Sequence, residues 1–414
     1  MRATLAALTL FLQSAITLLS AVTLLSAITL LSAVTSPASA LEVSGYVEAE
    51  GSAFLQDPLY SGEVRDSGSF SAQPEFYHEF KDGSSLTFVP FARVDSADDR
   101  RSHWDIRELN YLYLADNYEV RAGIGKVFWG VTEFVHLVDI INQTDFVESI
   151  NFEEKLGQPM VNLSIPGAWG VLDLFALPYF RERTFPGRKG RLRFPLVVDT
   201  DKARYESPDK ERHVDFAVRY SKSIGDWDIG LSHFSGTGRE PTIIMELNAR
   251  GRPVVIPYYE LINQTGLDLQ LVAGEWVWKL EAIYRSGQGE SFYSATGGFE
   301  YTFVNVLETG IDLGIVGEWI YDDRGENAVV IFDNDGVLGL RLSLNDAAST
   351  EFLAGLIQDA SSSSRALRVE ASRRLGSSFK ASIEAWAFFD APEEDILYSL
   401  RDDDFVKLEL AYYY

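Results

Sequence analysis

The sequence predicts an all-β protein, a transmembrane antiparallel up-and-down β-barrel formed by residues 41–414. Three observations support this fold class. Segments of roughly ten residues with alternating apolar and polar side chains recur along the chain. The connections between them alternate between short turns and long loops, and an apolar N-terminal segment of the kind used for export precedes them.

Each alternating segment has one apolar face and one charged face. In the last of them, residues 404–414, Val406 and Leu408 lie on one face and Lys407 and Glu409 on the other. Because side chains of a strand point to alternate sides, one face of each segment meets an apolar phase and the other meets water. The same pattern recurs at residues 214–220, 276–286, 311–322 and 338–345.

A soluble β-sandwich has the same alternation, so two further features decide between sandwich and barrel. Aromatic residues such as Trp276, Trp319 and Tyr412 stand at the ends of the apolar faces, as in the aromatic girdles of membrane barrels. The opposite faces carry charges at mid-strand, which suits a water-filled lumen. In lipid only a closed barrel leaves no strand edge unpaired, so many alternating strands indicate closure.

Short turns and long loops alternate, as in outer-membrane barrels with short periplasmic turns and long extracellular loops. Turn residues cluster at 81–84, 115–117, 166–168, 223–226, 273–275 and 375–378. Longer connections are expected near 57–72, 96–103, 129–157, 179–211, 237–259, 287–293, 323–335, 360–364 and 390–403. The pattern gives about 18 strands, with about 16 as the alternative because several are weak; residues 105–113 change phase midway, as at a β-bulge.

Residues 1–40 have the features of a signal peptide. Arg2 is their only charge, the stretch from Leu5 to Val34 is apolar, and Ala38-Ser39-Ala40 fits a signal-peptidase site. A transmembrane anchor is the alternative, because the apolar stretch exceeds the roughly 20 residues that span a bilayer. No Lys or Arg cluster follows it, so we favour a signal peptide and a mature chain that begins at Leu41.

The composition excludes several function classes. With 36 Lys and Arg against 61 Asp and Glu, the chain has a formal net charge of −25. Nucleic-acid binding is not expected, because its affinity depends on cationic side chains. The chain has no cysteine, so an exported form has neither a disulfide framework nor a thiolate metal site. We expect no cofactor.

Motifs for catalysis and for metal binding are weak. The five histidines, His78, His103, His136, His213 and His233, are scattered, with no Gly-x-Ser-x-Gly and no His-Glu-x-x-His motif. The segment from Asp333 to Gly336 resembles part of a calcium loop but lacks the distal glutamate. We therefore expect neither an enzyme nor a metal site.

The C-terminal segment from Phe405 to Tyr414 ends on an aromatic residue and resembles the assembly signal of Gram-negative outer-membrane porins. A narrower likeness lies in residues 107–109 (REL), 119–130 (EVRAGIGKVFWG) and 139–145 (DIINQTD). Their order is similar to a poorly characterised porin-like family of unknown function and, more distantly, to alginate-export and phosphate-selective porins. The resemblance implies the outer membrane of a Gram-negative bacterium and assembly by machinery that reads Tyr414.

The resemblance also implies that a long early loop folds into the lumen and narrows it, and the loop 129–157 is the candidate. Phe134, Leu137, Val138 and Ile141 have helical spacing after Thr132, so we expect a short amphipathic helix. The alternative is an extracellular loop with its own apolar cluster. The candidate constriction residues are Glu119, Arg121, Lys126, Glu133, His136, Asp139 and Asp145.

We expect this helix to lie against the wall at Gly123 and Gly125, because glycines let another backbone approach closely. Glu119 and Arg121 share that strand face. Lys126 has the opposite phase, toward lipid, so we expect a β-bulge to turn it inward.

Residues 181–193 form a basic run in an acidic protein, opposed only by Glu182. Such a loop would bind lipopolysaccharide phosphates or attract anionic solutes to the pore mouth. The alternative is a flexible, solvated loop. The basic residues are Arg181, Arg183, Arg188, Lys189, Arg191 and Arg193.

Together these features predict a porin-like outer-membrane channel for passive diffusion of small polar or charged solutes. It would contact the lipid bilayer and lipopolysaccharide. The alternative is a surface binding or adhesion barrel that acts through its extracellular loops.

Overall fold

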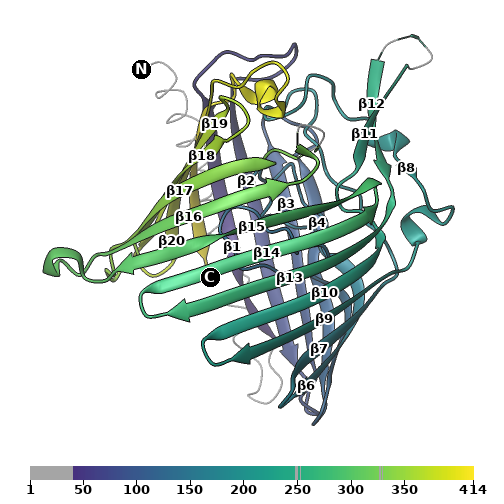
Figure 1. Ribbon diagram of the computed structural model, residues 1–414, viewed down its shortest axis with the longest axis vertical. Helices are drawn as coiled ribbons and strands as arrows, with labels where there is room; N and C mark the ends of the chain where they lie inside the picture. Colours follow the sequence, from purple (N-terminus) through teal and green to yellow (C-terminus); the bar gives the residue numbers. More distant parts are fainter. Residues whose placement is uncertain (1–40, 248–249, 252, 326–327, 329) are drawn as a thin grey trace.

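The chain forms a closed β-barrel (Figure 1). The computed structural model describes residues 41–247, 250–251, 253–325, 328 and 330–414. The predicted signal peptide, residues 1–40, lies outside these described residues. Each of the eighteen barrel strands pairs antiparallel with the barrel strands before and after it, and β1 (Glu42–Phe54) pairs with β21 (Phe405–Tyr413). The predicted antiparallel barrel of eighteen strands is confirmed.

The other barrel strands are β2 (Asp66–Glu79), β3 (Ser85–Asp95), β4 (His103–Leu114), β5 (Glu119–Gly125), β6 (Gln158–Gly167), β7 (Gly170–Leu177), β9 (Asp215–Ile224), β10 (Trp227–Thr237), β13 (Leu261–Ala273), β14 (Trp276–Gly287), β15 (Gly289–Phe303), β16 (Asp312–Asp322), β17 (Asn334–Ser343), β18 (Glu351–Asp359), β19 (Arg365–Leu375) and β20 (Phe379–Phe389). A separate small sheet contains β8 (Arg204–Tyr205), β11 (Thr242–Leu247) and β12 (Pro253–Tyr259).

The connections hold short 3-10 helices: η1 (Thr200–Lys202), η2 (Lys210–Arg212), η3 (Val306–Glu308) and η5 (Ile396–Leu400). Within the described residues, no helix has the length and apolar character needed to cross a membrane.

The two ends of the barrel differ in their connections. One end carries short turns together with the start of β1 and the end of β21; we call it the turn end. The other, the loop end, carries the long loops 126–157, 178–214, 238–260 and 390–404. In outer-membrane barrels the turns are periplasmic and the loops extracellular.

One predicted loop is wrong. Instead of a loop over 287–293, Gln288 alone joins β14 to β15. Gly287 and Gly289 flank it with φ of 101° and 69°, a region that glycine adopts without strain. The turn end also has two connections, 304–311 and 344–350, that the sequence pattern did not separate from the strands.

The predicted phase change in residues 105–113 is present. The pairing of β3 with β4 shifts register where Val89 faces Glu108 and Pro90 faces Ile106, so Arg107 is the extra residue of a bulge. Pro90 has no N–H to give to the ladder, which explains why the irregularity lies there.

The strand faces divide as the alternation predicts. Trp278, Trp319 and Leu338 are 47%, 50% and 62% exposed on the outside of the barrel. Glu281 and Glu318, on the opposite faces of β14 and β16, are buried. The charged faces therefore point inward and the apolar faces toward lipid.

The interior is apolar at the loop end. Two clusters of buried apolar side chains fill it, and each combines wall residues with residues of the loop 126–157. Cluster A includes Phe54, Phe134, Ile150, Ile320, Trp386, Phe388, Leu397 and Phe405. Cluster B includes Trp129, Val138, Ile141, Phe175, Leu177, Phe234, Ile262 and Phe292.

Loss of the last three residues, Tyr412–Tyr414, should prevent barrel assembly. Tyr412 and Tyr413 pair with Val47 and Tyr46, and the Tyr414 N–H donates to the Gly45 carbonyl at 3.2 Å. Truncation shortens the closing pair and removes the terminal aromatic residue. We expect unfolded periplasmic protein without heat-modifiable migration on gels. Tyr414→Phe, which keeps an aromatic terminus, should migrate as the wild type does. A truncated chain that folds normally would contradict the prediction.

Candidate functional site

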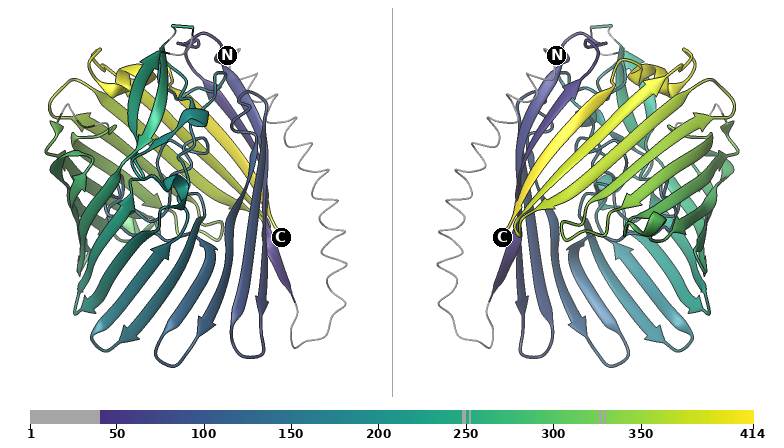
Figure 2. Two further views of the ribbon diagram at one scale, coloured as in Figure 1. Left: turned by 90° about the vertical axis from the view of Figure 1, so that its right-hand side faces the viewer. Right: turned by 90° about the vertical axis from the view of Figure 1, so that its left-hand side faces the viewer.

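The loop 126–157, between β5 and β6, lies inside the barrel (Figure 2). Its first half is bound by Glu281 of β14 and Glu318 of β16. Its second half is bound by Arg93 of β3 and Arg107 of β4. The loop therefore crosses the interior.

The Glu281 carboxylate holds three backbone N–H groups of the loop. It accepts hydrogen bonds from the N–H groups of Val131 at 2.7 Å, Thr132 at 3.1 Å and Val138 at 3.2 Å. The Thr132 hydroxyl donates to it at 2.6 Å. Glu281 is fully buried, and hydrogen bonds to an ionised acceptor are stronger than neutral ones.

Glu318 holds the next turn of the loop in the same way. Its two carboxylate oxygens accept from the N–H groups of Glu133 at 2.6 Å and Phe134 at 3.1 Å. The predicted amphipathic helix is wrong, because residues 132–141 contain turns and no helix. Wall carboxylates bind N–H groups near the start of this segment, where the helix was expected.

The apolar residues of the loop serve two clusters rather than one helix face. Phe134 belongs to cluster A, and Val138 and Ile141 belong to cluster B. Phe134 lies over Gly355 of β18, where an added Cβ would come within 2.5 Å of its ring. Val138 lies over Gly266 of β13, where a Cβ would be 3.1 Å away.

The glycine seat predicted on β5 is therefore wrong. A Cβ at Gly123 would meet the Leu109 carbonyl of the neighbouring strand, and one at Gly125 would approach Met160 and Arg121. The glycines that admit the loop lie on the opposite wall. The prediction placed the loop against the glycines that directly precede it in the chain. The loop is long enough to cross the lumen and reach the opposite wall instead.

The second half of the loop is anchored by ion pairs. Asp145 lies 2.7 Å from Arg107 and 3.6 Å from His103, and Glu148 lies 2.9 Å from Arg93. Burial opposes ionisation of Asp145, but its contacts with His103 and Arg107 outweigh it and hold its pKa well below the usual range. Asp145 is therefore an anionic anchor.

Glu133 is the predicted residue that faces the charged interior. Its carboxylate lies 2.7 Å from Arg341 and 3.7 Å from Lys279. Asp139 instead binds within the loop, 3.2 Å from Lys155, and burial raises the pKa of Asp139 despite that partner.

His136 and the β5 residues lie apart from Glu133. The His136 ring packs edge-on against Phe128 and lies 3.8 Å from Glu281. Glu119 is exposed at the turn end, and Arg121 shares the inner face of β5 with Gly125.

Lys126 turns inward without the predicted bulge. β5 ends at Gly125, so the strand phase no longer applies to Lys126, which lies 4.0 Å from Glu154. Burial lowers the pKa of Lys126.

The basic run 181–193 is largely built into the loop end instead of forming a cationic surface. Arg181 pairs with Asp105 at 2.8 Å, and Arg183 donates to Gln143 at 3.3 Å. Only Arg188 and Lys189 are exposed among its basic residues.

Two further arginines of this run fasten neighbouring loops together. Arg191 pairs with Asp403 at 2.6 Å, and Arg193 pairs with Glu63 at 3.3 Å. Burial raises the pKa of Asp403 to about 6 even beside Arg191. Sequence reasoning missed these acidic partners because they come from the loops 55–65 and 390–404.

The loop 126–157 separates two cavities. A cavity of about 590 Å³, which we call the turn-side cavity, is lined by Glu133, Glu153, Arg341 and Arg368 among others. A cavity of about 170 Å³, the loop-side cavity, is lined by Phe134, His136, Asp139, Arg285 and Phe292 among others. Adjacent loop residues thus face different cavities, and Asn151 alone lines both.

The turn-side cavity is strongly charged and has an acidic excess. Ten glutamates and six Lys or Arg residues line it. They include Glu48 and Glu50 of β1, which were missed although they alternate with Val47 and Ala49 in the sequence. An acidic excess in a confined space raises the local concentration of cations.

Replacing Glu281 with Leu should release the first half of the loop. Three buried N–H groups would lose their acceptor, at a cost of about 1–3 kcal/mol each. We expect proteolysis within residues 126–157 to become at least tenfold faster in the folded barrel. Asp228→Asn is the matched control, because Asp228 binds Ser223 near the turn end. Equal cleavage of both variants would contradict the anchoring role.

The fold is similar to solved porins. A BenF-like porin from Pseudomonas fluorescens Pf-5 matches with a TM-score of 0.52 and 10% identity, over 91% of this chain and 98% of that chain. OccK11 (OpdR) of Pseudomonas aeruginosa matches with a TM-score of 0.52 and 10% identity, over 91% and 95%. No family model and no curated protein sequence matches this chain. The chain therefore has the fold of porin-like outer-membrane β-barrels.

Proposed function

We propose that this chain is an outer-membrane channel for passive diffusion of small polar or charged solutes, and that the loop 126–157 sets the pore width. The observation that carries the proposal is the position of this loop, which divides a charged cavity from an apolar loop end. A pore needs a wet, charged lumen of limited width, and selectivity follows the charges at the narrowest ring. The role is non-enzymatic, since solutes move without a covalent step.

The lining favours cations over anions. Glutamates outnumber basic residues in the turn-side cavity, and Glu153 and Glu351 are exposed members of it. Arg341 and Arg368 are held by Glu133 and Glu153, which reduces their effect on anions. We therefore infer a preference for small cations and neutral polar solutes.

Two partner proposals accompany the channel role. The terminal strand β21 and Tyr414 are the segment that assembly machinery would recognise. Lipopolysaccharide phosphates would meet Arg188 and Lys189, the exposed part of the basic run. The bilayer contacts the apolar outer faces of the strands.

The second candidate is a surface binding or adhesion barrel. Clusters A and B fill the loop end of the interior, which favours a plugged barrel. The exposed apolar residues Met245 and Leu247 of β11 lie in the small sheet outside the barrel. Ion conductance in planar bilayers separates the candidates, because a plugged barrel gives no steady open level.

Replacing residues 133–145 with a short Gly-Ser linker should widen the pore. The change removes the N–H group that donates to Glu318, the ring that packs against Gly355 and the carboxylate that pairs with Arg107. We expect single-channel conductance to rise at least twofold, with heat-modifiable migration unchanged. Unchanged conductance in a folded barrel would show that the loop does not limit the pore.

Neutralising Glu153 should weaken cation preference. Glu153→Gln removes one carboxylate and leaves Arg368, its partner at 2.7 Å, paired with Glu370 alone. We expect the reversal potential across a salt gradient to move toward the equilibrium potential of the anion. Glu119→Gln is the control, because Glu119 is exposed at the turn end and does not line the cavity. A shift of equal size in both variants would contradict a selective role for the cavity.

A further inference from the structure

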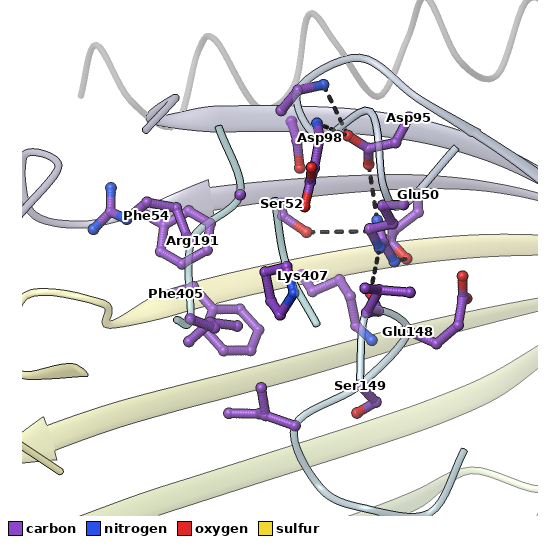
Figure 3. Close-up of a pocket in the computed structure, with 18 of the residues that line it drawn as sticks. Glu50, Ser52, Phe54, Asp95, Asp98, Glu148, Ser149, Arg191, Phe405 and Lys407 are labelled. Carbon is purple, nitrogen blue, oxygen red and sulfur yellow. Dashed lines mark hydrogen bonds and ion pairs between the residues drawn. The ribbon is translucent and has the colours of Figure 1, made fainter. Parts of the chain in front are cut away.

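A third cavity lies beside the seam where β1 and β21 close the barrel (Figure 3). This seam cavity has a volume of about 100 Å³. Ser52 and Phe54 of β1, and Phe405 of β21, contribute to its wall. The loops 55–65, 96–102, 126–157 and 178–214 contribute most of the other lining residues. A volume of this size admits a few water molecules or a small solute, since a water molecule occupies roughly 30 Å³ of liquid.

The seam cavity adjoins the turn-side cavity, and the two cavities share several lining residues. Five residues line both cavities: Glu50, Glu148, Ser149, Glu384 and Lys407. We call these five residues the junction. By contrast, the loop-side cavity shares only Asn151 with the turn-side cavity. Figure 3 displays Glu148, Ser149 and Lys407 together with Ser52 around the seam cavity.

The other end of the seam cavity reaches the loop-end surface. Val64 and Lys189 are both part of its lining, and both are solvent-exposed. Val64 belongs to the loop 55–65, and Lys189 belongs to the basic run. The seam cavity therefore has one end at the surface and the other at the junction.

The wall formed by β2 to β5 is more polar than the rest of the loop end. The buried wall residues of clusters A and B come from β1, from β6 onward and from β21, and none comes from β2 to β5. Besides Val89 and Phe91 of β3, these strands contribute buried polar residues such as Ser69, Arg93 and Asp105. The apolar filling thus leaves a polar arc next to the seam.

The junction has fixed charges on its two sides. On one side Arg101 forms two hydrogen bonds of 2.7 Å with the Glu50 carboxylate, and Arg93 holds both Glu50 and Glu148. On the other side Lys407 lies 2.6 Å from Glu384. Three carboxylates and one ammonium group thus share the junction with the Ser149 side chain.

We propose that solutes pass between the seam cavity and the turn-side cavity through the junction, and that Lys407 sets its charge preference. The loop-side cavity lies off this path. The inference rests on the proposed channel function and adds the route and the selecting residue. The solutes are small and polar, because the volume is small and the three carboxylates of the junction are paired with Arg93, Arg101 and Lys407. Lys407 limits how strongly cations are preferred.

The test uses cysteine labelling, because the chain has no native cysteine. Ser149→Cys places a thiol in the junction, Ser52→Cys places one in the seam cavity, and Ser294→Cys places one in the loop-side cavity. A small cationic methanethiosulfonate reagent is added to channels reconstituted in planar bilayers, and mass spectrometry measures labelling. We expect current to fall by at least half at Ser149→Cys and Ser52→Cys, and to stay unchanged at Ser294→Cys.

Three outcomes would overturn the route. One is full current after labelling at Ser149→Cys; a second is failure of the reagent to reach that thiol in a conducting channel; the third is block at Ser294→Cys. A wild-type barrel without any conductance would instead reject the channel function itself. The two failures are therefore distinguishable.

Lys407→Gln tests the selecting residue. We expect the reversal potential to move toward the equilibrium potential of the cation, because the junction loses its ammonium group. Lys155→Gln is the matched control, because Lys155 lines the loop-side cavity and pairs with Asp139. An unchanged reversal potential in a folded Lys407→Gln barrel, or an equal shift in the control, would remove Lys407 from the path.

Discussion

The arrangement of the interior depends on two wall carboxylates that bind backbone N–H groups. A loop inside a barrel has no water-facing side on which to satisfy its backbone, and an unpaired buried N–H costs about 1–3 kcal/mol. Glu281 and Glu318 accept five such groups between Val131 and Val138. These contacts fix where the loop crosses the lumen, and the turn-side and loop-side cavities lie on the two sides of that crossing.

The ion pairs at the other end of the loop have a different effect. Arg93 and Arg107 stand on β3 and β4 and bind Glu148 and Asp145, so this end of the loop lies against the polar arc. The carboxylates of the wall bind neutral N–H groups, whereas the guanidinium groups of the wall bind carboxylates. Glu281 and Glu318 thus spend their acceptor capacity on backbone N–H groups of the loop.

The barrel, its strand count and the bulge were predictable from the sequence, because they depend on local alternation and on its change of phase within residues 105–113. It could not reach the contacts of the loop. The apolar spacing of Phe134, Val138 and Ile141 matched a helix, but the three residues pack into two clusters that no period reveals. The basic run matched a cationic surface because the partners of Arg191 and Arg193 lie far away in the chain. Glu48 and Glu50 alternate with Val47 and Ala49, so the sequence already indicated that they share a polar strand face, but they were not predicted as lining residues.

The contrast between apolar and polar parts of the loop end bears directly on the route of an ion. Moving a bare charge from water into an apolar medium costs on the order of 20 kcal/mol by ideal Born estimates, and several kcal/mol even after relaxation. Clusters A and B impose that cost wherever they fill the interior. The arc of Ser69, Arg93 and Asp105 supplies fixed dipoles and charges in place of the hydration shell. A path along the seam therefore passes Asp98, Arg101 and the junction on its polar side, while Phe54 and Phe405 of cluster A line its other side.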